Sequence, residues 1–171
     1  MDFFDLIHKR QSVRSFTDEK ISDDDIIKIL EAAIKAPSAG NLQAFEIYVV
    51  KDKEKKLELS VAALDQDSIK EASHCIVFCA HPELSKSKYD EMGEKVYCIE
   101  DTTIACAYAQ LAAANLGYGS VWVGAIEEDK LRKVLSLDES LVPVSILPIG
   151  IPNEEPDSKP RRDFNDIVHN L

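Results

Sequence analysis

The segment IEDTTIACAYAQLAAANL, residues 99–116, constrains how the rest of this chain can be arranged. Its composition predicts a helix, and the residues are apolar or small on nearly every face. Such a helix has to be enclosed by other elements all round. In a chain of 171 residues, this pattern indicates that a partner subunit covers part of the helix.

Strands and helices alternate on both sides of this segment. Short runs rich in branched and aromatic residues predict strands over residues 44–52, 74–80, 119–126 and 142–150. Amphipathic or well-capped stretches predict helices over residues 2–9, 22–35, 53–64 and 127–136. This alternation favours a layered sheet with helices on both faces and leaves the strand order open. The tail from Ile151, with three prolines in ten positions, is predicted to be an extended arm.

The composition predicts a single globular domain, residues 1–171, with 31 acidic against 20 basic residues and a formal charge of -11. This acidic balance argues against a nucleic-acid binder or a protein of anionic membrane surfaces, because both need a broad basic face. No apolar run approaches the length of about 20 residues that crosses a membrane, and the first apolar stretch is too short for a secretory signal. We therefore expect a cytoplasmic protein whose four cysteines are reduced core thiols, with no metal site.

Two basic clusters stand out against the acidic background. Arg10, Ser12 and Arg14 alternate in KRQSVRSF, and in an extended segment this spacing turns the three side chains to one side. Guanidinium groups and a hydroxyl suit a phosphate group, although a solvated helix end explains the same residues. The second cluster, KPRR at residues 159–162, follows the proline-rich arm. Two such clusters in an acidic chain suggest one shared anion.

The turn APSAGNLQAF, residues 36–45, joins a predicted helix to a predicted strand. Its side chains Ser38, Asn41 and Gln43 carry donors and acceptors that can match the edge of a heterocycle. Turns in general favour several of the same residue types, so this stretch alone does not distinguish a binding turn from an ordinary one.

The glycines near residue 119 do not form a dinucleotide-binding fingerprint, because Trp122 stands where the third glycine is required and the pair precedes a strand. Gly124, inside a bulky strand, indicates a close approach to another backbone or to a flat ligand. The sequence has no nucleophile-elbow, zinc-protease or P-loop motif, and its four histidines are scattered. An enzyme with this sequence would rely on a cofactor to carry the chemistry.

Taken in order, these stretches resemble the nitroreductase family of FMN-dependent oxidoreductases. The resemblance rests on R-x-S-x-R at residues 10–14, PSAGNLQAF in the slot of P-S-x-x-N-x-Q-P-W, the glycine-rich stretch at residues 113–124, and G-x-P-x-E-x-P-x-x-K-P-R at residues 150–161. It covers nearly the whole chain. It implies an α+β fold of layered α-β-α architecture with a central mixed, mostly antiparallel sheet. It also implies a homodimer whose extended termini wrap the partner and whose FMN lies at the subunit interface.

The resemblance assigns two roles to the basic clusters. The ribityl phosphate of FMN would be held by Arg10, Ser12, Lys159 and Arg161. Arg14 would lie beside N1 and O2 of the flavin ring, where a positive charge favours reduction.

The resemblance also implies contacts to the flavin ring and to the substrate. The flavin contacts, of which the first five come from the other subunit, would be Pro37, Ser38, Ala39, Asn41, Gln43, Val123 and Gly124. The backbone N–H of Gly124 would point at flavin N5, the atom that accepts hydride. Residues 81–97 would line or cover the pocket, and the substrate contacts within them would be Tyr89, Met92 and Tyr97.

The implied activity is a ping-pong reaction in which NAD(P)H reduces bound FMN and a small electrophile, such as a nitroaromatic or a quinone, takes up the hydride. One alternative is a specialist of the same fold, which could be a flavin-fragmenting, dehalogenating or azoline-oxidising enzyme. Another is a flavin-binding or redox-sensing module without turnover. Ala44 and Ala125 replace residues that are common in the family, so the shape of the pocket stays open.

Overall fold

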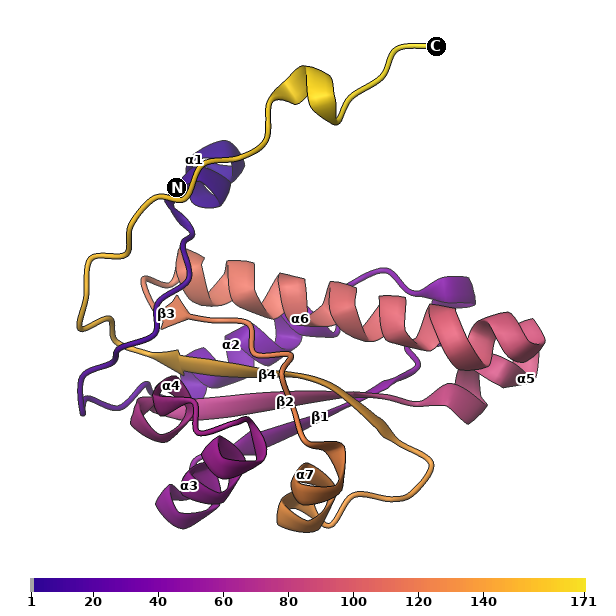
Figure 1. The fold of residues 1–171 in the computed structure, drawn as a ribbon, viewed down its shortest axis with the longest axis horizontal. Helices are drawn as coiled ribbons and strands as arrows, with labels where there is room; N and C mark the ends of the chain where they lie inside the picture. The colour runs from indigo at the N-terminus through magenta and orange to yellow at the C-terminus, as the bar shows by residue number, and fades with distance from the viewer. Residues whose placement is uncertain (1) are drawn as a thin grey trace.

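The computed structural model describes residues 2–171 and shows a four-stranded sheet with helices on both faces (Figure 1). The strands are β1 (Phe45–Val50), β2 (His74–Ala80), β3 (Gly119–Ser120) and β4 (Val142–Gly150), in the order β1-β2-β4-β3. All three pairs are antiparallel, which confirms the mostly antiparallel character of the predicted sheet, and none of its strand pairs within residues 2–171 makes it mixed. The connection from β1 to β2 leaves and re-enters the sheet at the same end, and such a connection makes antiparallel neighbours. Within residues 2–171, parallel pairing is limited to one isolated bridge between Ser12 and Ser120.

The strand predicted over residues 119–126 is much shorter than expected. It keeps two residues as β3, and Val123 then makes an isolated bridge to Ile146. Pro148 of β4 has no N–H to donate, which interrupts the ladder between these two points. The predicted strands at 74–80 and 142–150 are confirmed at the same residues.

The predicted helices are confirmed, with shifts of one or two residues at their ends. They are α1 (Phe3–Lys9), α2 (Asp23–Ala33), α3 (Lys53–Ala62), α6 (Cys98–Asn115) and α7 (Glu128–Leu135). The start of α2 follows from local chemistry, because Ser22 Oγ accepts a hydrogen bond from the N–H of Asp25 at 3.2 Å.

Two helices and three short turns are additional to the predicted set. The helices are α4 (Asp67–Glu71) and α5 (Pro82–Met92), and the short elements are η1 (Ala39–Asn41), η2 (Gly93–Tyr97) and η3 (Phe164–Asp166). Sequence periodicity does not reveal α5, because Ser85 is its only buried residue and the helix has no apolar stripe.

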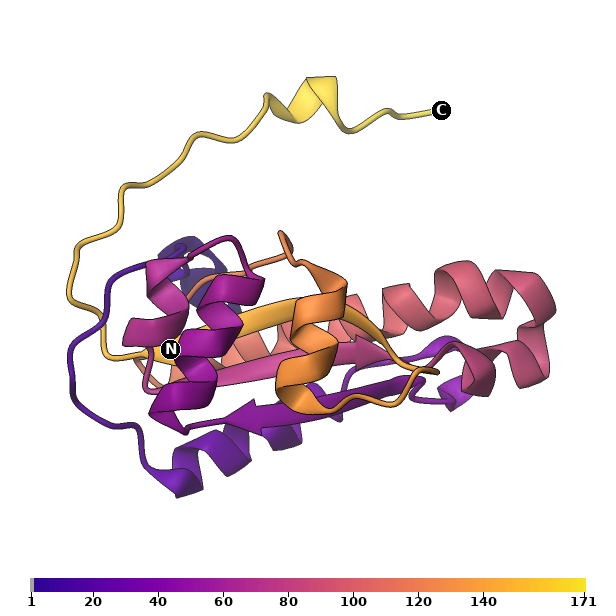
Figure 2. The same cartoon turned by 60° about the horizontal axis from the view of Figure 1, so that its bottom comes forward.

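The core has one layer on each face of the sheet (Figure 2). Strand β2 is buried at every residue and serves both layers, with Val77 packed among α3, α4 and α7, and Phe78 packed among α2 and α6. This confirms the layered α-β-α arrangement. All four cysteines are buried free thiols, as predicted.

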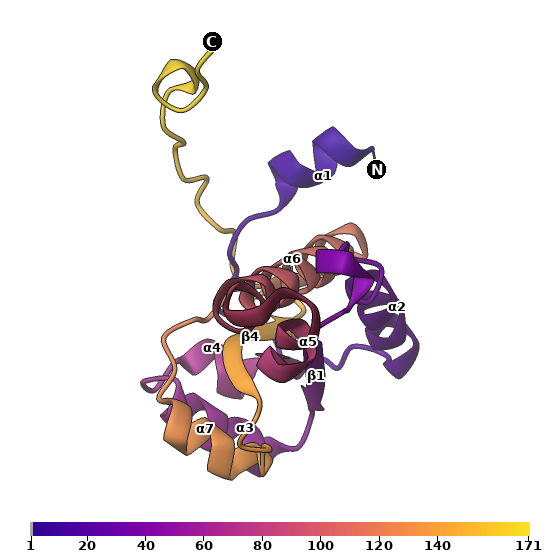
Figure 3. The same ribbon diagram turned by 90° about the vertical axis from the view of Figure 1, so that its right-hand side faces the viewer.

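Helix α6 is fully buried along one face, and its other sides are partly exposed. Ala105, Cys106 and Ala109 are fully buried, whereas Tyr108, about a quarter turn from this face, is 40% exposed. Helix α1 contacts α6 on the side away from the sheet, and the tail beyond Ile151 extends on the same side (Figure 3). Within residues 2–171, no helix combines the length and the apolar character needed to cross a membrane.

Candidate functional site

The first basic cluster lies on an extended segment at the β3 edge of the sheet. The N–H of Val13 donates to the carbonyl oxygen of Ser120 at 3.0 Å, and the N–H of Thr17 donates to that of Ile151 at 2.9 Å. Phe16 packs so closely on Gly150 that a Cβ there would lie 2.6 Å from its ring. These contacts fix the backbone that carries Arg10, Ser12 and Arg14.

The two basic clusters meet in one groove of about 310 Å³. Its lining includes all five residues assigned to phosphate or to flavin charge, namely Arg10, Ser12, Arg14, Lys159 and Arg161. Within residues 2–171, no carboxylate lies within ion-pair distance of the three guanidinium groups. The groove therefore presents three guanidinium groups that can bind an anion from outside the chain.

Glu154 also lines this groove, and sequence reasoning assigned it no role. Its Oε1 accepts hydrogen bonds from the backbone N–H groups of Arg14 and Ser15. The carboxylate of Glu154 therefore connects the proline-rich arm to the first basic cluster by hydrogen bonds. The available signal was the acidic position in the G-x-P-x-E motif, which lies two residues beyond Pro152.

The turn at residues 36–45 is a strained loop held by its own side chains. Gly40, Asn41 and Gln43 have φ of 55°, 59° and 51°, in the left-handed region. Ser38 Oγ accepts from the N–H of Gln43 at 3.0 Å, and Gln43 Nε2 donates to the carbonyl oxygen of Asn41 at 2.9 Å. A turn this closely bonded presents a preformed surface.

Asp101, near the start of α6, holds the loop at residues 36–45 in place by a hydrogen bond. The residue is 2% exposed, its Oδ1 accepts from the N–H of Ala39 at 2.8 Å, and its Oδ2 has no hydrogen-bond partner within residues 2–171. Sequence reasoning missed Asp101 as well. The signal was the pair Glu100 and Asp101, the two charged residues in a segment that is otherwise uncharged.

One of the three predicted substrate residues, Tyr89, lies beside the same turn, and a second, Tyr97, packs on it. A Cβ added at Gly40 would lie 2.6 Å from Tyr89 Oη, so α5 packs directly on the loop. The rings of Tyr89 and Tyr97 meet edge to face, with centroids 5.2 Å apart. Met92 is 51% exposed near the end of α5.

Gly124 and Val123 differ in what they can offer to a ligand. Val123 is buried and exchanges two backbone hydrogen bonds of 2.9 Å with Ile146. Gly124 is exposed, and its N–H donates no hydrogen bond within the described residues 2–171. A Cβ there would meet only the indole ring of Trp122, at 3.4 Å, which leaves the backbone accessible.

Within one chain, the extended segment that carries the first basic cluster and the turn at residues 36–45 lie at opposite ends of α6 (Figure 1). Ser12 pairs with Ser120, just beyond the end of the helix, whereas Ala39 is bonded to Asp101 in its first turn. From residue 101 to residue 115 the helix rises about 20 Å. A single copy therefore does not bring the two groups of predicted residues together.

Comparisons with known proteins agree with the fold. Residues 7–66 and 58–151 match the sequence model described as the Nitroreductase family. A protein of Archaeoglobus fulgidus, whose name provisionally assigns it as an NADH dehydrogenase/NAD(P)H nitroreductase, is 40% identical over 96% of this chain and 94% of its own length. An FMN reductase (NADPH) of Bacillus subtilis is 31% identical over 96% of this chain and 72% of its own length.

A solved structure of NfrA2 from B. megaterium superposes with a TM-score of 0.91 at 31% identity, covering 97% of this chain and 72% of the other. The sequence match and the shared fold lead to one assignment. The chain belongs to the nitroreductase family, and it is an oxidoreductase of the NAD(P)H nitroreductase and FMN reductase group.

Proposed function

We propose that this protein binds FMN and transfers hydride from NAD(P)H to a small electrophilic acceptor, such as a nitroaromatic or a quinone, in a ping-pong cycle. The observation that carries the proposal is the convergence of Arg10, Arg14 and Arg161 with Ser12 and Lys159 in one groove. The names of the relatives, an FMN reductase and a nitroreductase, support the same cofactor and donor.

The donor set of the chain fits FMN. Arg10, Ser12, Lys159 and Arg161 would hold the phosphate, since guanidinium and ammonium groups and a hydroxyl all donate to phosphate oxygens. When bound, FMN supplies a ring that accepts a hydride at N5 and passes it to a second substrate. The unpaired N–H of Gly124 is a donor suited to N5, and its open backbone lets a flat ring approach.

Arg14 would supply charge rather than anchorage. Its guanidinium is exposed in the groove while its backbone N–H is held by Glu154. A fixed positive charge near N1 and O2 stabilises the negative charge that reduction places there, and it costs no reorganisation during the reaction. Arg14 would therefore raise the reduction potential of the flavin.

We propose that the complete site forms in a homodimer. The groove and the turn lie at the two ends of α6, which rises about 20 Å between them, so each half-site is incomplete in one chain. A second copy with its α6 running in the opposite direction would bring its turn, with Ser38, Asn41 and Gln43, to the groove of the first. Exposed apolar side chains on this side support an interface, because Phe3, Phe4 and Tyr108 are 60%, 69% and 40% exposed.

The proposal is tested by an absorbance spectrum of the purified protein and an anaerobic titration with NADH and with NADPH. We expect a flavin spectrum that bleaches with one of the donors and returns when a nitroaromatic or quinone is added. Bound flavin that no nicotinamide reduces would instead indicate a binding or sensing module. Protein that takes up no FMN would contradict the proposal.

A further inference from the structure

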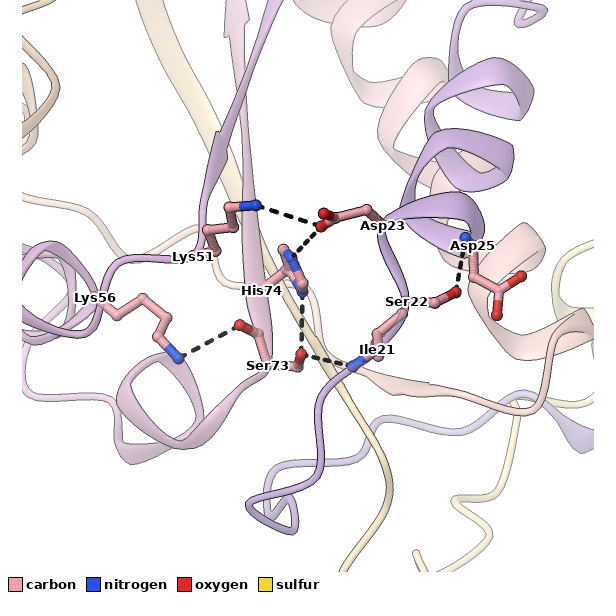
Figure 4. A network of polar contacts seen from close by, with 8 residues as sticks. All are labelled: Ile21, Ser22, Asp23, Asp25, Lys51, Lys56, Ser73 and His74. Carbon is pink, nitrogen blue, oxygen red and sulfur yellow. Dashed lines mark hydrogen bonds and ion pairs between the residues drawn. The ribbon is translucent and has the colours of Figure 1, made fainter.

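A second groove, of about 910 Å³, shares no lining residue with the basic groove described above. It is bounded by the segment 17–23 that leads into α2, by the β1–α3 connection at residues 51–56, and by residues 70–74 at the start of β2. Figure 4 shows side chains from these three segments pointing toward one another. Nothing in the proposed flavin chemistry uses this groove.

His74 carries a buried donor at the wall of the groove. Its side chain is 6% exposed, and its Nδ1 lies 3.0 Å from Ser73 Oγ. Since Ser73 Oγ already accepts from the N–H of Ile21 at 2.9 Å, its own proton is free to donate to Nδ1 (Figure 4). The ring proton then belongs on Nε2, which has no hydrogen-bond partner within residues 2–171. A buried donor left in this state costs about 1–3 kcal/mol.

The structure also indicates what kind of group would satisfy this donor. The nearest acceptor, Asp23 Oδ1, is 3.9 Å from His74 Nε2 and 3.4 Å from Lys51 Nζ. An anionic oxygen is therefore the atom on which these donors converge. Asp23 is 74% exposed, so its carboxylate can rotate away and leave the position to another anion.

The lining of the groove is less acidic than the chain as a whole. The lining has five lysines and five carboxylates, in a chain whose formal charge is -11. Of the carboxylates, Asp52 caps α3 and Glu71 accepts from the N–H of Phe16. Lys20 and Lys53 make no ion pair within residues 2–171, and neither do the lining carboxylates Asp18 and Glu19. The two lysines are therefore the cations available to a ligand that His74 binds.

Helix direction adds to this potential. The first residues of both α2 and α3, Asp23 and Lys53, line the groove, so two helix N-termini face it. The three aspartates at residues 23–25 balance the positive end of α2, so the end of α3 contributes more to binding an anion.

We propose that this groove binds an oxyanion, the phosphate group of a small molecule, through His74 Nε2–H with Lys20 and Lys53 as cations. Burial lowers the pKa of His74 from its ordinary value, which keeps the imidazole neutral near pH 7. The ring therefore contributes a hydrogen bond, and the lysines contribute the charge. The groove is large enough for a ligand beyond the phosphate group itself.

The test is nitrogen-detected NMR of the histidine side chains during titration with inorganic phosphate, with chloride at matched ionic strength as the reference. The chain has four histidines, so the spectrum is simple to assign. We expect phosphate to shift the Nε2 resonance of His74 in a saturable manner, and chloride to leave it unchanged. Phosphate that occupies the flavin-side groove would leave this signal unchanged, so the result is independent of the proposed function.

A charge-matched pair of surface variants completes the test. We expect Lys20→Ala with Lys53→Ala to weaken phosphate binding at His74 about tenfold, the sum of two partly exposed ion pairs. The control is Lys35→Ala with Lys133→Ala, which removes two exposed lysines outside the groove. A His74 signal that phosphate does not move, or an equal loss of affinity in both double variants, would overturn the proposal.

Discussion

At the scale of single residues, Asp101 links the central helix to the turn that we assign to the flavin. A buried hydrogen bond to a charged acceptor contributes about 1.5–3 kcal/mol, and Asp101→Ala removes it from the N–H of Ala39. We expect this variant to lose stability by that order and to bind FMN more weakly. Asp101→Asn retains an acceptor oxygen, so its stability and FMN affinity should be closer to those of the wild type. Urea unfolding measures the stability, and flavin fluorescence measures the binding of FMN. An alanine variant with the stability and FMN affinity of the wild type would refute the role of Asp101.

The cysteines give a second prediction at this scale. Burial raises the pKa of Cys75, Cys79 and Cys106 to about 12. At pH 8 such a thiol is ionised in about one molecule in 10,000, and the thiolate is the reactive form. We expect a thiol-specific disulfide reagent to label none of these three in native protein and all four cysteines after denaturation. Rapid native labelling of Cys75 would show that the β2 core opens easily.

The residues that sequence could and could not predict differ in a physical way. Arg10, Ser12 and Arg14 share a side of an extended segment, and alternation in the sequence is enough to predict that. Asp101 and Glu154 act on backbone N–H groups that are 62 and 140 residues away in the chain, and pairings of that kind depend on the tertiary fold. Their roles became visible only with the structure.

At the scale of elements, the fit of Phe16 on Gly150 holds the segment with the first basic cluster against β4. A Cβ at residue 150 would lie within 2.6 to 2.8 Å of three Phe16 atoms, and Phe16 is 5% exposed. We expect Gly150→Ala to destabilise the fold by about 1–3 kcal/mol, as overpacking does. Adding Phe16→Leu should recover part of this loss. Urea unfolding of the wild type, the two single variants and the double variant measures these changes in stability. Strictly additive changes in the free energy of unfolding would contradict the steric explanation.

The contact between Tyr118 and Asp25 joins the end of α6 to the start of α2. Hydrogen bonds from Lys28 at 2.7 Å and from Tyr118 at 2.6 Å lower the pKa of Asp25 to about 2. Because this value is below the ordinary 3.8, the stabilisation is fully present above pH 3.8 and is lost as the pH falls toward 2.

We therefore expect Tyr118→Phe to lower the melting temperature at neutral pH, and the difference from the wild type to shrink below about pH 3. Tyr48→Phe is the matched control, because Tyr48 is partly buried like Tyr118 and its hydroxyl makes no hydrogen bond within residues 2–171. Thermal unfolding of both variants and the wild type, measured across this pH range, tests this prediction. A difference that stays constant with pH would exclude the proposed coupling to Asp25.

Elements with their own local signals were predictable. Ser22 and the aspartates after it predict the start of α2, and the apolar run at residues 74–80 predicts β2. The short β3 was not predictable, because its length depends on Pro148 in a strand that follows it in the chain. Helix α5 lies almost entirely at the surface, and no periodic pattern marks it.

At the scale of the whole molecule, the sequence of α6 and its exposure in one chain lead to the same conclusion. The helix was predicted to be enclosed all round, and the single chain fully buries one face. The partly exposed sides lie between the two half-sites, so a second copy that covers them would also complete the flavin site. The sequence could predict that another subunit covers α6. The positions of the two half-sites at its ends could be seen only in the structure.

The most direct test of this account is a mixed dimer made from two variants with different tags. One copy carries Arg10→Ala and Arg14→Ala, and the other carries Asn41→Ala and Gln43→Ala. In a symmetric dimer with shared sites, both defects fall on one site and the other remains intact, so we predict about one FMN for each mixed dimer. The pure variant dimers should bind little. FMN occupancy in the mixed dimer no higher than in the pure variants would contradict a site shared between two copies.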